Sequence, residues 1–263
     1  MSLNEKQNED KNLKILAIIS SPRKKNTYNA IKTIESIHKE KNDCEYEYLF
    51  LKNIDLKCCN GCHLCLTKGE EKCPLKDDRD TIINKIESSD GVILASPNHS
   101  MNVNWRMKNF IDRFSYLLHR PRYFHQRFMV LITSGSYRGI KEATNALAIM
   151  ASGGKVISKI GVMNSPGMND TKKNKQSKKL RREAKKFVKK MKKPFNFKPT
   201  FGYLVWFSAF KAMSQVNENE SIADHEYYSN KDFFIEMNLK LGQKFVLKTF
   251  QAIFRGLLKI GLV

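Results

Sequence analysis

Short apolar runs alternate with amphipathic stretches along the first part of the chain. The apolar runs are six to eight residues long and lack a helical period, which is typical of strands buried on both faces of a sheet. The stretches between them repeat apolar residues at helical spacing. The pattern predicts strands at 14–20, 45–51, 91–96, 127–133 and 155–162, and helices at 27–38, 77–88, 104–120 and 140–152.

Strands that alternate with helices indicate right-handed βαβ units and a parallel sheet covered on both faces. We therefore predict an α/β protein with a doubly wound sheet of five parallel strands. In such a sheet a ligand binds outside the carboxyl ends of the strands, where the strand order reverses. The turns that follow the strands are thus the places to look for functional residues.

The chain changes character after the fifth predicted strand. Residues 171–193 hold 13 Lys and Arg against one acid, with apolar residues at helical spacing, which indicates the last helix of the α/β domain. Pro194 and Pro199 then interrupt the chain. An aromatic run at 203–213, a polar stretch at 217–228 and a long amphipathic helix predicted at 233–260 follow.

This pattern divides the chain into three predicted parts. Residues 1–12 are predicted to be disordered or tag-like, and residues 13–193 to form the α/β domain. Residues 194–263 are predicted to form a helical extension that serves oligomerisation or binding to a membrane surface.

Composition narrows the class of protein. With 41% hydrophobic residues, the 263-residue chain has the composition of a globular protein. The first twelve residues lack the apolar run of a signal peptide, and no stretch has the eighteen apolar residues of a membrane span, so we expect a cytoplasmic protein. The net charge of +21 is concentrated at 171–193, where a solvated helix face accounts for it, so we do not expect nucleic acid as a partner.

The turn SSPRKKNT at 20–27 joins the first strand to the first helix. It has neither the G-x-G-x-x-G of a dinucleotide site nor the G-K-[ST] of a P-loop. Its hydroxyls, an amide and Arg23 meet at a helix N-terminus, an arrangement that suits a terminal phosphate such as that of FMN. In the alternative interpretation, Thr27 is only a helix N-cap and Arg23 only a surface cation.

Two further motifs follow the third and fourth strands: SPNHSMNVN at 96–104, with KNFIDR at 108–113, and TSGS at 133–136. With the S-P-R…N-T turn, they resemble the NADPH-dependent FMN reductase and multimeric flavodoxin families over about residues 14–162. The resemblance implies a flavodoxin-like sheet with strand order 2-1-3-4-5. It also implies an FMN-dependent oxidoreductase that takes electrons from NAD(P)H to a quinone, flavin, aromatic or protein acceptor.

The resemblance also implies roles for individual residues. The FMN phosphate would be held by Ser21, Arg23, Asn26 and Thr27. The isoalloxazine and ribityl chain would pass beside Pro97, Asn98, His99, Met101 and Asn102. The polar edge of the ring would contact Thr133, Ser134, Gly135 and Ser136. Relatives usually carry Tyr where His99 stands, so His99 either stacks on the flavin, brings a titrating proton near it, or has no role.

No catalytic acid–base pair is expected, because the flavin itself carries the redox chemistry. The acidic and basic residues that flank the helices are predicted to act in helix caps and ion pairs. They are Asp77, Asp78, Asp112 and Arg113.

Four of the six cysteines lie in CCNGCHLC, residues 58–65. The spacing Cys59-x2-Cys62-x2-Cys65-x7-Cys73, with Pro74 after the last cysteine, is similar to the bacterial ferredoxin pattern. It resembles the iron-sulfur flavoprotein branch of the family, which implies a [4Fe-4S] cluster. Other relatives keep a similar loop with redox-active or structural thiols, and this alternative stays open.

Two rival functions belong to other classes. The first is an electron-transfer protein with FMN and [4Fe-4S] but no small-molecule substrate of its own. The second is a module that binds a membrane surface through the C-terminal helix. As partners we expect a second copy of the chain, in a homodimer or homotetramer, with a redox protein and a membrane surface as further candidates.

Overall fold

The computed structural model describes residues 12–216 and 220–260. The predicted disordered N-terminus lies outside these residues, apart from residue 12. The described chain forms two compact units. Unit 1 consists of residues 12–58, Asp77–Phe114 and Arg122–Phe195; unit 2 consists of Cys59–Lys76, Ser115–Pro121 and residues 196–216 and 220–260.

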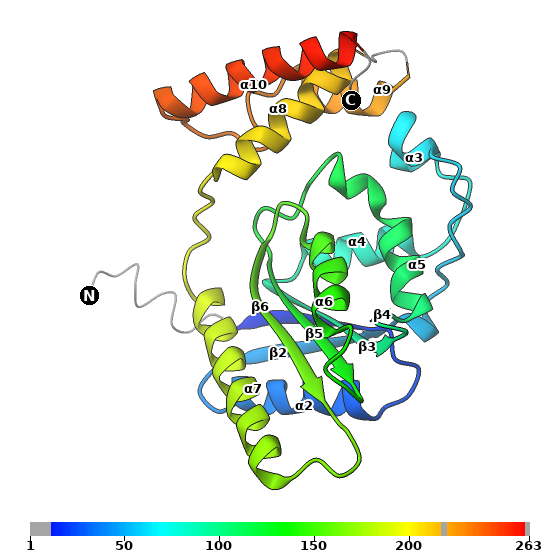
Figure 1. The fold of residues 1–263 in the computed structure, drawn as a ribbon, viewed down its shortest axis with the longest axis vertical. Helices are drawn as coiled ribbons and strands as arrows, with labels where there is room; N and C mark the ends of the chain where they lie inside the picture. Colours follow the sequence, from blue (N-terminus) through cyan, green and yellow to red (C-terminus); the bar gives the residue numbers. More distant parts are fainter. Residues whose placement is uncertain (1–11, 217–219, 261–263) are drawn as a thin grey trace. The chain divides into compact units, whose positions relative to one another are not determined.

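Unit 1 is built on a parallel sheet with the strand order β2-β1-β3-β5-β6 (Figure 1). The strands are β1 (Leu13–Ile19), β2 (Cys44–Phe50), β3 (Gly91–His99), β5 (Arg127–Ser134) and β6 (Lys155–Met163). A short strand, β4 (Asn102–Val103), pairs antiparallel with the end of β3. The predicted five parallel strands and their order are confirmed, and the bounds agree within one residue except at β3, which continues to His99.

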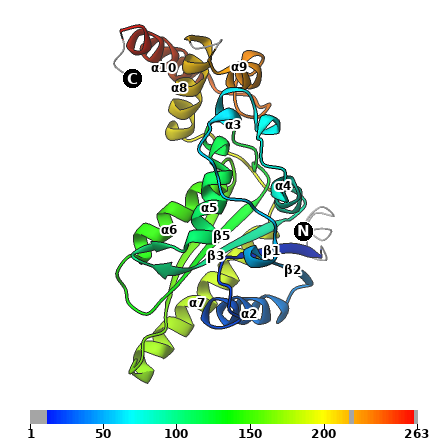
Figure 2. The same ribbon diagram turned by 90° about the vertical axis from the view of Figure 1, so that its right-hand side faces the viewer.

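Helices cover both faces of this sheet (Figure 2). On one face lie α2 (Asn26–Lys39) and α7 (Asp170–Met191). On the other lie α4 (Arg79–Glu87), α5 (Trp105–Arg113) and α6 (Ile140–Ala148). Short 3-10 turns at Leu51–Asn53 and Ile149–Ala151 follow β2 and α6. The central strands β1, β3 and β5 are mostly apolar and buried, which explains why their positions could be read from the sequence.

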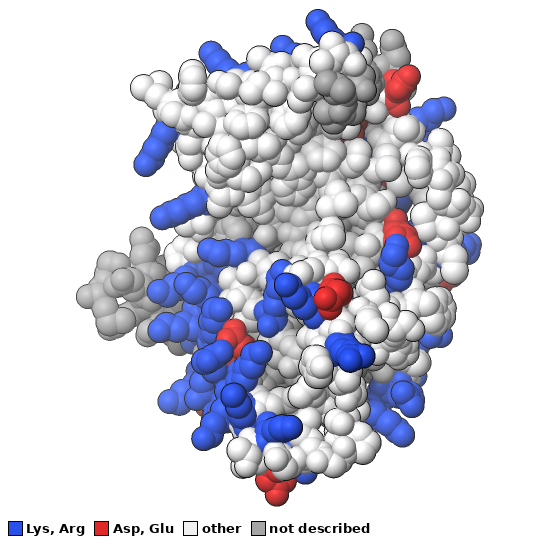
Figure 3. All heavy atoms as spheres, viewed as in Figure 1, with Lys and Arg blue, Asp and Glu red and all other residues white. Residues whose placement is uncertain are grey.

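The basic segment forms α7 and packs on the sheet through its apolar residues. These are Leu180, Ala184, Phe187, Val188 and Met191, all of them buried. The lysines and arginines of α7 form a blue band on the outer surface of unit 1 (Figure 3). Within the residues that the structure describes, no helix is both long enough and apolar enough to span a bilayer.

Unit 2 is helical. Its elements are α3 (Leu64–Thr67), the 3-10 turns Glu70–Lys72 and Ser115–Leu118, α8 (Phe201–Val216), α9 (Ile222–Ser229) and α10 (Leu241–Lys259). Its core is aromatic: the ring centroids of Phe207 on α8 and Tyr228 on α9 lie 5.5 Å apart. Helix α9 was not predicted, because its polar residues show no clear amphipathic stripe.

Two predicted helices are too long. The helix predicted at 233–260 begins only at Leu241, because Phe233 and Phe234 both pack on Phe207, with centroid distances of 5.4 and 5.1 Å. Adjacent residues of an α-helix point about 100° apart and do not face the same neighbour. The helix predicted at 104–120 ends at Arg113, where the chain passes from unit 1 to unit 2.

A buried histidine joins the two helices that cover one face of the sheet. The Nε2–H of His38 on α2 donates to the carbonyl of Ala184 on α7 at 3.0 Å, and the hydroxyl of Tyr46 donates to Nδ1 at 2.6 Å. Both contacts suit the neutral imidazole. Burial lowers the pKa of His38 to about 4, although the hydrogen bond to Ala184 acts in the opposite direction.

We expect mild acid to weaken unit 1 through His38. Because its folded-state pKa lies below the 6.5 of an exposed histidine, the stabilisation is complete above pH 6.5 and is lost as the pH falls toward 4. Between pH 7 and pH 5 the free energy of unfolding should fall by about 2 kcal/mol from this group. Urea denaturation at both pH values should show a smaller fall in His38→Gln; an equal fall in both proteins would contradict the expectation.

Candidate functional site

The turn between β1 and α2 leaves a helix N-terminus open. The N-cap position is Lys25, whose side chain makes no capping hydrogen bond. The first N–H groups of a helix have no partner inside the helix, so here they remain available to a ligand. Thr27 is the second residue of α2, so its interpretation as the N-cap is wrong. Its hydroxyl lies 2.7 Å from that of Thr133 at the end of β5, and this pair is buried.

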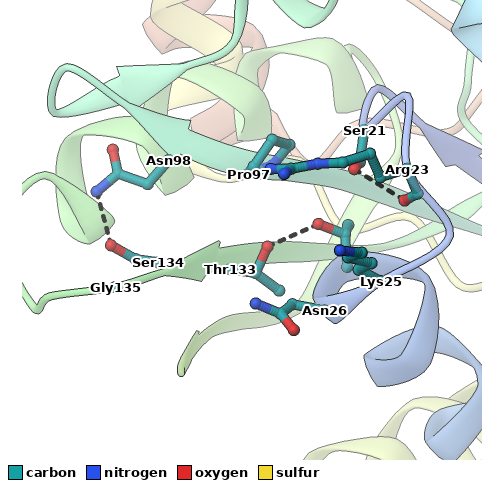
Figure 4. A pocket seen from close by; sticks show the side chains of 10 residues that line it. Ser21, Arg23, Lys25, Asn26, Pro97, Asn98, Thr133, Ser134 and Gly135 are labelled. Atoms are coloured by element: carbon teal, nitrogen blue, oxygen red, sulfur yellow. Dashed lines mark hydrogen bonds between the residues drawn. The ribbon is translucent and has the colours of Figure 1, made fainter. Parts of the chain in front are cut away.

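Three segments that are far apart in the sequence line one pocket at this edge of the sheet (Figure 4). The pocket lies where the strand order reverses, beside the ends of β1, β3 and β5. Its lining residues are Ser21, Arg23, Lys25, Asn26, Thr27, Pro97, Asn98, Thr133, Ser134 and Gly135. None of these ten is acidic and two are cations, so the pocket suits an anion.

Nine of the ten lining residues were predicted from the sequence, and Lys25 was missed. Four other predicted residues are near this edge but do not line the pocket. They are His99, Met101, Asn102 and Ser136, all of them exposed. Ser136 nevertheless supports the lining, since its N–H donates to the hydroxyl of Ser134 at 3.2 Å.

Asn98 has one buried polar atom without a partner. Its Nδ2 donates to the Ser134 hydroxyl at 3.0 Å and to the Arg138 carbonyl at 2.7 Å. Its Oδ1 is buried and accepts no hydrogen bond from any residue that the structure describes. A buried acceptor without a hydrogen bond costs free energy, so a ligand with an N–H or O–H donor would stabilise this site by binding to Oδ1.

Asn104 connects the first two turns of the site. Its Nδ2 donates to the carbonyl of Ser20 at 3.0 Å, and its Oδ1 caps α5 by accepting from the N–H of Met107 at 3.1 Å. Its own N–H donates to the hydroxyl of Ser96 at 3.2 Å. Asn104 was not among the predicted site residues, although an Asn directly before a helix is a common N-cap.

A close backbone contact fixes the turn between β3 and β4. Ser100 and Met101 adopt positive φ angles of 49° and 63°. Gly139, just before α6, lies so near that a Cβ atom there would be 2.2 Å from the Cα of Met101. Only glycine fits this position, and the contact holds the β3–β4 turn against the start of α6.

The two ends of the cysteine segment 59–76 are fixed side by side in unit 1. The buried guanidinium of Arg113 donates to the carbonyl of Lys57 at 2.9 Å and to Asp77 at 3.0 Å. Asp77 in turn accepts from the N–H of Lys57 at 3.0 Å and from the N–H of Arg79, the first residue of α4, at 3.2 Å. Burial would raise the pKa of Asp77, but Arg113 and the N–H groups of Arg79 and Lys57 together lower that pKa below its usual value. The predicted ion-pair role of these two residues is confirmed.

The cysteine segment itself belongs to unit 2. Cys59 and Cys62 are exposed, whereas Cys65 and Cys73 are half-buried. Burial raises the pKa of the Cys65 thiol, and so do the other three thiols, which therefore lie nearby. Among the described residues, no three side chains of His, Cys, Asp or Glu converge on a single metal ion.

Arg120 holds the cysteine segment to the C-terminal helices within unit 2. Its guanidinium is buried and donates to the carbonyls of Cys65 and Leu66 and, at 3.0 Å, to Glu70. It also pairs with Asp224 on α9, which lies 2.7 Å from the Nδ1 of His119. Although burial acts in the opposite direction, Asp224 and Glu70 raise the pKa of Arg120 above its usual value.

Comparison with known proteins places these features in context. Residues 13–168 match the family described as NADPH-dependent FMN reductase. An iron-sulfur flavoprotein of Archaeoglobus fulgidus is 40% identical over 111 residues, which cover 41% of this chain and 49% of that protein. A second iron-sulfur flavoprotein of the same organism is 30% identical over 155 residues, which cover 59% of this chain and 75% of the relative.

The match to solved structures concerns the fold. A flavone reductase superimposes with a TM-score of 0.52 at 16% identity, over 68% of this chain and 63% of the other. The chain thus spans about half the length of the first Archaeoglobus relative and under two thirds of the flavone reductase.

We expect Arg120→Met to lower the free energy of unfolding by about 3–5 kcal/mol, because the buried carboxylate of Asp224 would lose its guanidinium. Urea denaturation measures this loss. The double variant Arg120→Met/Asp224→Leu should be more stable than the single one, since it also removes the buried carboxylate of Asp224. Arg122→Met is the matched control: Arg122 pairs with Glu87 at the surface, and its loss should cost under about 1 kcal/mol. Equal effects of Arg120→Met and Arg122→Met would contradict the expectation.

Proposed function

The chain belongs to the NADPH-dependent FMN reductase family, in its iron-sulfur flavoprotein branch, and from this premise we propose that it is an FMN-dependent oxidoreductase. The proposed electron donor is NAD(P)H, and the proposed acceptor is a quinone, a flavin, an aromatic compound or a redox protein. The observation that carries the proposal is the acid-free pocket beside an uncapped helix N-terminus.

The pocket residues fit the two ends of FMN in different ways. The N-terminus of α2, the Ser21 hydroxyl and the cations of Arg23 and Lys25 suit the phosphate dianion. The unpartnered Oδ1 of Asn98 suits an N–H or O–H donor of the ring or ribityl chain. The order of these groups along the pocket supports phosphate binding at β1 and ring binding beside β3 and β5.

When bound, FMN would supply the redox chemistry by accepting a hydride and passing electrons on. The chain's own residues would bind and orient it. The hydroxyl contact of Thr27 and Thr133 joins the start of α2 to the end of β5, and Asn104 ties the turn after β1 to α5. Asp77 and Arg113 are engaged with each other, which supports the view that neither acts as an acid or base.

We also propose that Cys59, Cys62, Cys65 and Cys73 hold a [4Fe-4S] cluster. The cluster would supply one-electron transfer. The supporting observations are the influence of the other three thiols on the pKa of Cys65 and the Arg120 contacts that fix the carbonyls of Cys65 and Leu66. The cluster also supports a second candidate function, in which the protein transfers electrons between partners and has no small-molecule substrate of its own.

For partners, we propose a homodimer or homotetramer. Three large apolar side chains are exposed in the segments that follow β3 and β5: Met101 at 59%, Trp105 at the start of α5 at 60%, and Tyr137 at 74%. Exposed apolar groups on neighbouring turns are typical of a surface that another molecule covers. A redox protein as partner stays a prediction.

We expect the protein to bind FMN, and Arg23→Gln to weaken binding by about 10- to 100-fold, because a charge-assisted hydrogen bond contributes about 1.5–3 kcal/mol. Titration of apo-protein with FMN, followed by flavin fluorescence, measures the dissociation constant. The control is Lys24→Gln, which removes a neighbouring cation that does not line the pocket. Absence of FMN binding by the unmodified chain would reject the proposed function, and equal affinity of both variants would reject the role of Arg23.

We expect anaerobically purified protein to contain iron and acid-labile sulfide in equal amounts. Cys62→Ala should lose most of both, whereas Cys58→Ala should retain them, since Cys58 lies next to the four-cysteine set but outside it. Colorimetric iron and sulfide analysis and the visible spectrum measure the outcome. Iron-free protein with normal FMN binding would leave the oxidoreductase proposal standing and reject the cluster.

A further inference from the structure

Helix α10 exposes most of its apolar residues. Of the residues from Leu241 to Lys259, only Leu247 is buried. Exposed side chains include Leu241 at 87%, Phe245 at 71% and Ile253 at 46%, with Ile260 just past the helix end at 67%. Monomeric soluble proteins rarely leave such a set of large apolar side chains uncovered on one helix.

The exposed residues share one side of α10, while the other side packs on α8. The Ser208 hydroxyl on α8 donates to the carbonyl of Leu247 at 3.2 Å, and Phe250 contacts Phe201 edge to face at 5.6 Å. With about 100° per residue, Leu241, Phe245, Ile253 and Ile260 fall within an arc of about 120°. The packing of α10 in unit 2 therefore leaves a separate outer apolar face.

Cations border this apolar face. Lys244, Lys248, Arg255 and Lys259 fall within an arc of about 60° directly beside the exposed apolar residues. No acidic residue follows Glu236 in the chain. In Figure 3 the surface of α10 is mostly uncharged, with lysines and arginines at its margins. The outer face is thus apolar on one side and purely cationic on the other.

We propose that the outer face of α10 docks in the plane of an anionic lipid bilayer. The exposed apolar side chains would enter the boundary of the acyl chains, and the long cationic side chains would reach the headgroups. A second copy of the chain fits less well, because a symmetric contact would set the same cations against one another. Nucleic acid fits less well too, since phosphates offer nothing to Phe245 or Leu241.

Flotation of the full-length protein with lipid vesicles tests this proposal. The protein should bind vesicles of phosphatidylcholine mixed with phosphatidylglycerol, and should not bind phosphatidylcholine alone. Phe245→Ser and Ile253→Ser should each weaken the partition coefficient by about tenfold, because each removes an apolar side chain from the lipid. Both residues are exposed in the protein, so the substitutions leave its core unchanged.

The basic helix α7 requires a matched control, because it would attract anionic vesicles without inserting. Lys244→Gln/Lys248→Gln/Lys259→Gln on α10 and Lys178→Gln/Lys185→Gln/Lys189→Gln on α7 remove the same charge. The α10 set should weaken binding by about fivefold per cation, and the α7 set by clearly less. In Phe245→Trp, added brominated lipid should quench the fluorescence more than in the unmodified protein.

Three results would overturn the proposal. In the first, Phe245→Ser/Ile253→Ser leaves vesicle binding unchanged and the α7 set abolishes it. Binding to lipid would then belong to α7 alone. Another is no binding to anionic vesicles. In the third, the protein does not bind vesicles, and analytical ultracentrifugation shows a dimer that Phe245→Ser dissociates. The outer face of α10 would then bind a second copy of the chain. None of these outcomes depends on whether FMN or iron is bound.

Discussion

The structure depends on one geometric constraint: the carboxyl ends of the parallel strands meet at one edge, where the order of the sheet reverses between β1 and β3. Backbone carbonyls and N–H groups at this edge have left the sheet ladder and need other partners. Asn104 meets part of this need by donating from its side chain to the carbonyl of Ser20, while the hydroxyls of Thr27 and Thr133 pair with each other. The N-terminus of α2 and the Oδ1 of Asn98 are left without a side-chain partner, and these are the features that an anionic ligand with hydrogen-bond donors would use.

The cysteine segment is constrained twice, by different means. In unit 1, the Arg113–Asp77 pair sets its two ends beside each other through the backbone of Lys57. In unit 2, Arg120 fixes its middle by binding backbone carbonyls and two carboxylates. Both guanidiniums are buried, and breaking either pair would leave a charge in an apolar environment. The C-terminal extension thus supplies, through Asp224, part of the framework around the cysteines.

Features that depend on neighbouring residues in the sequence were predicted, whereas contacts between residues far apart in the sequence were not. Strands were found because nearly every residue of β5 is buried, and nine pocket residues because they follow strands in recognisable motifs. The Arg120–Asp224 pair joins residues 104 positions apart, and neither has a local pattern that points to the other. The helix start at Leu241 was missed for a similar reason: Phe233 and Phe234 fit an amphipathic helix, but packing on Phe207 holds them outside one.

The two basic helices show why net charge alone is a poor guide to partners. Helix α7 carries eleven Lys and Arg against Asp170 and Glu183, yet its apolar residues are all turned to the sheet, so its cations border only water and surface acids such as Glu40. Helix α10 carries fewer cations, but they adjoin large apolar side chains that its packing on α8 leaves exposed. Solvation accounts for the first arrangement completely. It does not account for the second, because water stabilises the lysines of α10 but gains nothing from Leu241 or Phe245.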